Sequence, residues 1–199
     1  MEYIFLIVIL IFSIVIHEVA HGSVAYYLGD PTAKYAGRLT LNPLKHLDPI
    51  GSVIVPLFLI LLNSGIVFGW AKPVPVNPRN FKDQKYGSLK VSLAGPMANL
   101  AIALIFGLVL RFISLPLSLS AMFAYIVLIN ILLAVFNLIP IPPLDGSHIL
   151  FTFLPYSAQK LKFFLRQFGM VIIIFVILFG FPYISFAVSW LFTLITGLT

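Results

Sequence analysis

Residues 3–27 form one long apolar run, "YIFLIVILIFSIVIHEVAHGSVAYY", which restricts the chain to a membrane fold. As a helix this run would be about 37 Å long, enough to cross a hydrocarbon core of about 30 Å. Across the chain 61% of residues are hydrophobic and only 9% are charged, far from the averages of soluble proteins. No basic segment precedes the run, so we predict the retained first helix of an integral membrane protein and not a signal peptide.

Two further apolar runs, residues 89–110 and 121–138, are long enough to span a membrane. Residues 168–181 and 183–198 are separated by a proline and predict a closing helical hairpin. Residues 52–62, "SVIVPLFLILL", are too few for a spanning helix and also contain a proline. We therefore expect this run to re-enter the membrane, with a crossing as the open alternative.

Proline marks two segments as non-helical. Residues 69–81, "GWAKPVPVNPRNF", alternate proline and valine and are expected to be extended. The run 121–138 leads into "NLIPIPPLDGSHIL", whose prolines must break the helix, and unpaired backbone at membrane depth is tolerated only where it lines a site or is buried in protein. The predicted fold is an all-α polytopic membrane protein with five to six transmembrane helices, one broken helix and a short extended or re-entrant segment, in a single transmembrane domain, residues 1–199.

The basic residues predict the orientation of the chain, because Lys and Arg are enriched on the cytoplasmic side of membrane proteins. If residues 52–62 do not cross and the N-terminus is outside, eleven of the twelve Lys and Arg lie inside. If they do cross, the better arrangement has the N-terminus inside and eight basic residues in the cytoplasm. The first arrangement is favoured and places the end of the first helix near the cytoplasmic face. The net charge of +6 then reflects membrane orientation, and we expect no nucleic-acid partner.

The first run contains "HEVAH", in which His17 and His21 share one helix face and can bind the same cation. Glu18 lies beside them but is rotated around the helix, so it can reach a metal-bound water without being a ligand. This is the H-E-x-x-H arrangement of zinc hydrolases. Hydrogen bonding of the two histidines to neighbouring helices is the alternative, but it leaves Glu18 as an unpaired acid at membrane depth. A metal site is therefore the favoured interpretation.

Catalytic zinc usually has three protein ligands, so a third residue is needed. The chain has no cysteine, which restricts the choice to histidine and acidic residues. Asp145 follows the proline-broken segment, and we predict it as the third ligand in preference to His148 and His46. His148 lies one helical turn further on and is a candidate for supporting the ligands. Capping of the resumed helix is an alternative role of Asp145 that is compatible with a ligand role. The other candidates lie in polar loops: Asp30, Asp48, Asp83 and His46.

Three motifs in this order, "HEVAH", "AGPMAN" and "NLIPIPPLDG", resemble the site-2 protease family of intramembrane zinc metalloproteases. The stretches "LTLNPLKHLDPIG" and "GWAKPVPVNP" are similar to the short prokaryotic members, and the loops are too short for the PDZ or nucleotide-binding domain that the family often has. The resemblance implies one Zn²⁺ per chain with three ligands and a catalytic acid/base: His17, His21, Asp145 and Glu18. It also places Asn99 and Asn137 beside the site as substrate or oxyanion contacts, with hydrogen bonding between helices as the equally weighted alternative.

The resemblance implies an intramembrane protease that hydrolyses peptide bonds within or near transmembrane helices of membrane proteins. Zinc lowers the pKa of its water, and Glu18 takes the proton. The expected location is the cell membrane of a prokaryote, with the active site toward the cytoplasmic side. The expected partners are the lipid bilayer and a transmembrane protein or peptide substrate, while the sequence names neither that substrate nor the oligomeric state.

Two alternatives remain open at this point. A transporter or ion pathway that uses the buried His/Glu cluster is the competing function, although a proton relay does not require the His-Glu-His spacing. The stretch "AKPVPVNP" is a candidate for pairing with an unwound substrate helix, or else it is a plain surface loop.

Overall fold

Four long helices dominate the computed structural model, which describes residues 2–55, 58, 61 and 71–198. They are long and apolar enough to cross a membrane: α1 (Glu2–Tyr27), α4 (Gly87–Phe112), α5 (Leu117–Asn137) and α7 (Gln159–Thr196). The first three confirm the predicted helices over residues 3–27, 89–110 and 121–138. By length and composition the chain is a multi-pass membrane protein.

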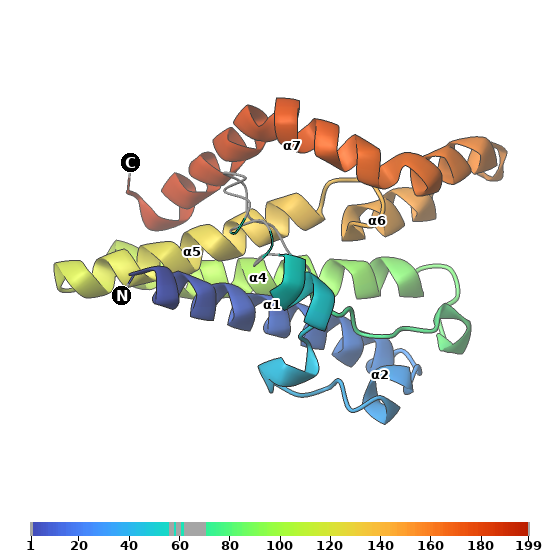
Figure 1. Ribbon diagram of the computed structural model, residues 1–199, viewed down its shortest axis with the longest axis horizontal. Helices are drawn as coiled ribbons and strands as arrows, with labels where there is room; N and C mark the ends of the chain where they lie inside the picture. Colours follow the sequence, from blue (N-terminus) through green and yellow to red (C-terminus); the bar gives the residue numbers. More distant parts are fainter. Residues whose placement is uncertain (1, 56–57, 59–60, 62–70, 199) are drawn as a thin grey trace.

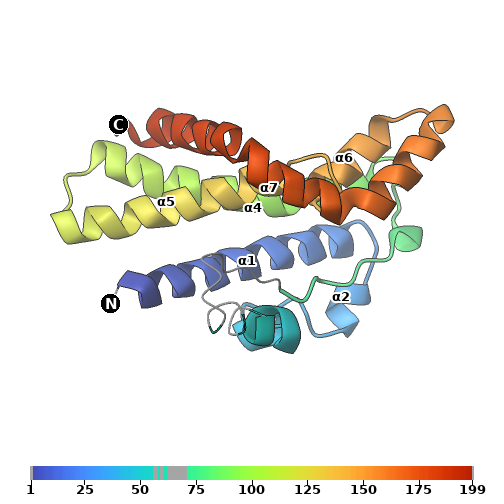
Figure 2. The same ribbon diagram turned by 45° about the horizontal axis from the view of Figure 1, so that its top comes forward.

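The long helices pack with alternating direction, as Figures 1 and 2 show. Helix α4 is central, because it contacts α1, α5 and α7. The two termini lie at one end of the bundle, and α2 (Thr32–Tyr35) and α6 (Asp145–Phe153) lie at the other (Figure 1). One of two buried apolar clusters lies where α4, α5 and α7 meet: Ala103, Val127, Ile131 and Val188. Most large apolar side chains of α7 are exposed, as expected for a helix whose solvent is lipid.

Short helical turns lie in the connection between α1 and α4. They are η1 (Pro43–Lys45), η2 (Pro49–Ile54) and η3 (Pro78–Asn80). Residues 71–77 have no regular secondary structure, and the described part of the chain contains no strand. The predicted re-entrant run, residues 52–62, lies mostly outside the described residues.

The predicted closing hairpin is wrong, because its two halves belong to the single helix α7, which contains Pro182. The described part of the chain therefore has four candidate spans and not five or six. A hairpin turn between two spans needs residues that suit the membrane surface, whereas "VILFGFPYISF" has no charged residue. Proline is tolerated inside membrane helices and bends them, and Figure 1 shows α7 bent along its length. At about 57 Å, α7 is also longer than one bilayer core of about 30 Å.

Helix α5 ends at Asn137, and helical structure begins again at Asp145 in α6. The seven residues between them, 138–144, follow a path of turns that packs against α7. At the contact, Gly169 of α7 is so close that an added Cβ would lie 2.1 Å from the Pro142 carbonyl oxygen. This packing fixes the position at which α6 begins.

Candidate metal centre

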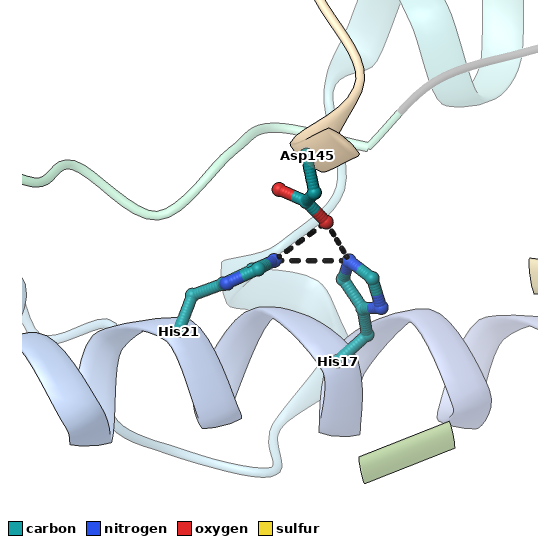
Figure 3. A group of neighbouring side chains, drawn as sticks. All are labelled: His17, His21 and Asp145. Carbon is teal, nitrogen blue, oxygen red and sulfur yellow. Dashed lines mark hydrogen bonds and ion pairs between the residues drawn. The ribbon is translucent and has the colours of Figure 1, made fainter. Parts of the chain in front are cut away.

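His17 and His21 project from the same face of α1, as their spacing predicts. Their Nε2 atoms lie 3.0 Å apart, and both side chains are buried. Figure 3 shows both rings pointing toward Asp145, the first residue of α6. The Asp145 Oδ2 atom lies 3.1 Å from His17 Nε2 and 3.2 Å from His21 Nε2. The fold thus brings Asp145 to the two histidines, although it lies 128 positions after His17 in the chain.

The capping role considered for Asp145 is wrong. The cap position of α6 is Leu144, which makes no side-chain hydrogen bond to the helix, and Asp145 is already in the first turn. Its carboxylate is instead directed at the two imidazoles, with 18% of the side chain exposed.

The three nearest ligand atoms form a triangle of the right size for zinc. Tetrahedral zinc holds nitrogen and oxygen ligands at about 2.0–2.2 Å, which places the ligand atoms about 3.3 Å from one another. The observed sides are 3.0, 3.1 and 3.2 Å. Two imidazoles and one carboxylate are a donor set of catalytic zinc, which keeps its fourth position for water. The residues present therefore fit a zinc ion.

Helix α4 holds both rings by the nitrogen that faces away from this triangle. His17 Nδ1 lies 2.6 Å from Asn99 Oδ1, and His21 Nδ1 lies 2.7 Å from the Val91 carbonyl oxygen. Metal-binding histidines commonly donate their second N–H in this way, which fixes the ring orientation. Asn99 is therefore placed behind His17, where its side chain is fully buried.

Gly95 allows α4 to approach the rings. A Cβ added at this position would lie 2.4 Å from His21 Nε2 and 2.5 Å from His17 Nε2. The next residue, Pro96, has no N–H and sits inside the helix, so one helical hydrogen bond is missing beside the rings. Close approach and ring anchoring together explain "AGPMAN" in physical terms. Neither Gly95 nor Val91 was predicted from the sequence; the signal was a Gly-Pro pair inside a spanning helix.

Glu18 faces a different part of the chain. Its Oε2 accepts a hydrogen bond of 2.8 Å from the Val74 N–H, in the segment of residues 71–77. The same segment is attached to Asp30, just after α1, where the Asn77 N–H donates to the carboxylate at 2.6 Å. The side-chain amide of Asn80 donates to Asp30 as well, at 2.8 Å. The polypeptide beside Glu18 is therefore held by several hydrogen bonds.

Asp30 is fully buried at this attachment. Burial alone would raise the pKa of its carboxyl group, but hydrogen bonds from Thr32, Asn77 and Asn80 outweigh burial and hold the pKa below its ordinary value. The ionised carboxylate is the form that accepts all of these bonds.

A cavity of about 370 Å³ opens beside the ligand group. The candidate ligands and Glu18 line it, and so do Val74 and Val76 of residues 71–77, which we call the extended segment after their expected conformation. Asn137 and His148, predicted beside the site, line it as well, and Asn137 Nδ2 donates to the Leu133 carbonyl of its own helix. His46 does not belong to the group: it is buried in the loop after α2, with Nε2 2.9 Å from the Thr40 carbonyl oxygen.

Two buried polar residues behind His17 were also missed by the sequence reasoning. Asn130 of α5 and Ser13 of α1 contact Asn99, and all three are buried. The available signal was the lone asparagine in the apolar run "AYIVLINILLAVF", because a polar residue inside a spanning helix is usually paired.

Comparison with known proteins points to the same chemistry. A family model described as "Peptidase family M50" matches residues 113–180. The protein of Bacillus subtilis (strain 168) named "Putative zinc metalloprotease YwhC" is 40% identical over 195 residues, which cover 94% of this chain and 84% of that protein. The protein of Mycolicibacterium smegmatis named "Putative zinc metalloprotease Rip2" is 34% identical over 168 residues, covering 81% of this chain and 62% of its own length. The protein of the same name in Mycobacterium tuberculosis (strain ATCC 25618 / H37Rv) is 32% identical over 188 residues, which cover 92% of this chain and 70% of that protein. No solved structure matches the chain.

Four apolar helices, two histidines on one face of α1 and an aspartate that meets them, together with the relatives, define a multi-pass membrane zinc metalloprotease. The chain belongs to peptidase family M50, the site-2 protease family. Zinc is the cofactor of this family. Membership in it favours a protease over the transporter that was considered as the competing function.

Proposed function

We propose that this chain is an intramembrane protease that hydrolyses peptide bonds within or near transmembrane helices of membrane proteins. One zinc ion would be held by His17 Nε2, His21 Nε2 and the Asp145 carboxylate, and the proposed protease is a single transmembrane domain over residues 1–199. The observation that carries the proposal is the triangle of ligand atoms with sides of 3.0–3.2 Å, in which α4 anchors both imidazoles from behind.

Glu18 is the general acid and base of the proposed reaction. When bound, zinc lowers the pKa of a coordinated water toward about 7 and polarises the scissile carbonyl. The Glu18 carboxylate takes a proton from the attacking water and returns it to the leaving amine. The hydrogen bond from the Val74 N–H occupies Oε2 and orients the group, which leaves Oε1 for the proton. Asn137 and His148 line the cavity, which supports a role for them as substrate contacts.

Replacing Glu18 by glutamine tests this role directly. The purified Glu18→Gln chain is expected to retain stoichiometric zinc by elemental analysis and to lose cleavage of co-expressed single-span membrane proteins. His17→Ala is the matched variant that loses both zinc and cleavage. Cleavage by the Glu18→Gln chain would contradict the mechanism, and zinc flux through wild-type proteoliposomes without any cleavage would favour the transporter.

The extended segment is the proposed docking strand for the substrate. A substrate helix hides its peptide groups in hydrogen bonds and must unwind before cleavage, so an exposed backbone beside the metal can receive it. The N–H groups of Lys72, Val74 and Asn77 are already donated within the chain. Within the described part of the chain the Val76 N–H has no such partner, and its side chain lines the cavity.

Val76→Pro removes that donor, and Val76→Ala is the control that trims the side chain but keeps the N–H. We expect the proline variant to cleave about tenfold more slowly with unchanged zinc content, since one backbone hydrogen bond in a dry site is worth about 1 kcal/mol or more. Val74→Pro is a poorer test, because it also releases Glu18. Wild-type cleavage by Val76→Pro would identify the segment as a plain surface loop.

We further propose that the chain lies in the cell membrane of a prokaryote with the metal site toward the cytoplasm. Eleven of the twelve Lys and Arg belong to residues 34–90 and 160–166, around the connections from α1 to α4 and from α5 to α7, and only Arg111 lies at the connection from α4 to α5. Because the chain has no cysteine, single-cysteine variants report the topology cleanly. In intact cells an impermeant maleimide is expected to label Ser114→Cys and to spare Gln84→Cys; the reverse pattern would contradict this orientation.

A further inference from the structure

A line of buried polar side chains crosses α1, α4 and α5 behind His17. Asn99 Oδ1 faces the ring at 2.6 Å, and Asn99 Nδ2 lies 2.8 Å from Asn130 Oδ1 and 3.2 Å from the Ser13 carbonyl oxygen. Asn130 Nδ2 in turn lies 3.0 Å from Ser13 Oγ and 2.8 Å from the Ile126 carbonyl oxygen. Both asparagines are fully buried. Every polar atom of the two amides thus has a partner inside the bundle.

Two backbone carbonyls decide which way each amide points. A carbonyl oxygen only accepts hydrogen bonds, so the group facing Ile126 must be the NH₂ of Asn130, and the Asn130 oxygen then faces Asn99. Asn99 must in turn present its NH₂ to that oxygen and to the Ser13 carbonyl, which leaves its own oxygen for His17. A reversed Asn99 would place its oxygen against two acceptors, a costly arrangement in a buried site.

The oxygen that faces His17 selects one tautomer of the neutral ring. Nδ1 must carry the hydrogen, which leaves the lone pair on Nε2, the atom next to Asp145 and His21. The other tautomer carries its hydrogen on Nε2 and cannot bind a metal through that atom. We infer that Asn130 and Ser13 are positioning residues that keep Asn99 in the orientation that prepares His17 to receive zinc. This inference rests on the proposed zinc site.

His21 needs no such support and serves as an internal reference. Its Nδ1 faces the Val91 carbonyl oxygen, an acceptor of the α4 backbone that cannot reverse. Loss of Asn130 should therefore change His17 and leave His21 as it is. A general loosening of the bundle would affect both rings.

The imidazole ¹⁵N shifts are measured on the full chain in detergent with zinc removed and Asp145 replaced by alanine in every variant, because the Asp145 carboxylate would otherwise favour a hydrogen on His17 Nε2. The zinc affinity is measured with Asp145 in place. The chain has four histidines, so the signals of His17 and His21 can be assigned by single substitutions. In Asn130→Leu we expect His17 to show a mixture of both tautomers and His21 to remain protonated on Nδ1. Zinc affinity, measured by competition with a chelator, should fall about tenfold, the lower end of the range for residues that support metal ligands. Asn130→Ala is the second variant should the leucine not be accommodated.

Two controls separate positioning from stability. Ile131→Ala removes a fully buried neighbour on the same helix but leaves the polar line intact, so the tautomer and zinc affinity should stay as in the wild type. Asn99→Asp offers only acceptors to His17, so adding it to Asn130→Leu should restore the Nδ1–H tautomer. Wild-type shifts and affinity in the Asn130 variants, or an equal loss in Ile131→Ala, would overturn the inference. A wild-type chain that binds no zinc would overturn the proposed function instead.

Discussion

The C-terminal half of α1 is held by two very different regions of the chain. On one side α4, inside the bundle, holds both histidine rings through their Nδ1 atoms. On another side residues 71–77, which have no regular structure, hold Glu18 through the Val74 N–H. The proposed metal ligands therefore depend on close packing between helices, whereas the proposed catalytic carboxylate depends on a hydrogen bond from a connecting segment.

This difference suggests that metal binding and turnover can be separated by mutation. Close-packed helices tolerate almost no added volume at their contacts, because side chains there interdigitate without voids. A segment held by a few hydrogen bonds can shift while the rest of the protein stays folded. We therefore expect variants of the α4 contact to lose zinc, and variants of the segment to keep zinc but lose activity.

The largest effect is expected for Gly95→Ala. The new Cβ would lie 2.4 and 2.5 Å from the two Nε2 atoms, and the rings cannot move away from α4 without giving up their bonds to Asn99 and Val91. Moving both ligands should weaken zinc binding by about 100-fold or more, the upper end of the effect of losing ligand support. The measurement is the zinc content of the purified chain after dialysis against a weak chelator.

Gly180→Ala is the matched control, since it adds the same methyl group to a spanning helix at an ordinary contact distance of 3.4 Å from Val176. It should retain zinc like the wild type. Full zinc occupancy in Gly95→Ala would show that the contact between α1 and α4 is looser than the packing argument requires.

The next effect is on the other side of α1, at the attachment of the extended segment. Asp30→Ala removes the acceptor of Asn77 and Asn80 and so releases residues 71–77 from the end of α1. A displacement of about 1 Å at a catalytic group can reduce the rate by about 100-fold, so we expect cleavage to fall at least tenfold. Zinc content should be unchanged, because neither ring is attached to this segment.

Asp83→Ala is the control for this variant. Asp83 lies on the same flank but pairs with Lys90 at the surface, at 2.7 Å, where an ion pair contributes little. Its cleavage rate should equal that of the wild type. Loss of zinc in Asp30→Ala would show that the two sides of α1 are not independent.

The sequence predicted one side of α1 better than the other, for a physical reason. His17, His21 and Asp145 are side chains whose chemistry is costly in a membrane, so their presence pointed to a metal before any geometry was known. The acceptor of His21 is the Val91 backbone carbonyl, which every residue type possesses and no sequence pattern marks. Gly95 likewise matters through the absence of a side chain.

Long-range contacts were the other limit. The bond between Glu18 and Val74 joins residues 56 positions apart, and no periodicity or spacing predicts it. The proline rule that placed a break at the end of α5 also predicted a hairpin at Pro182, where the chain remains helical. The surroundings of these prolines differ. After α5 there are three prolines within four residues, 140–143, and polar residues follow them, whereas Pro182 is alone in apolar sequence.

The smallest expected effect concerns the charge that holds the extended segment. The pKa of Asp30 in the folded chain is below its ordinary value of 3.8, because hydrogen bonds to the carboxylate outweigh the effect of burial. Its contribution to stability is therefore complete above that ordinary value and is lost as the pH falls through the lower folded-state pKa.

In zinc-free protein, the melting temperature of the wild type should exceed that of Asp30→Asn at pH 6, and the gap should close below about pH 4, since protonation makes the two side chains alike in charge. Asp83→Asn should show a smaller gap, because the bond from Lys90 that lowers the pKa of Asp83 lies at the surface. A gap that stays constant down to pH 3 would mean that shape, and not charge, holds the segment. The region beside Glu18 would then be held by close packing, like the histidines on the α4 side of α1, and not by its hydrogen bonds.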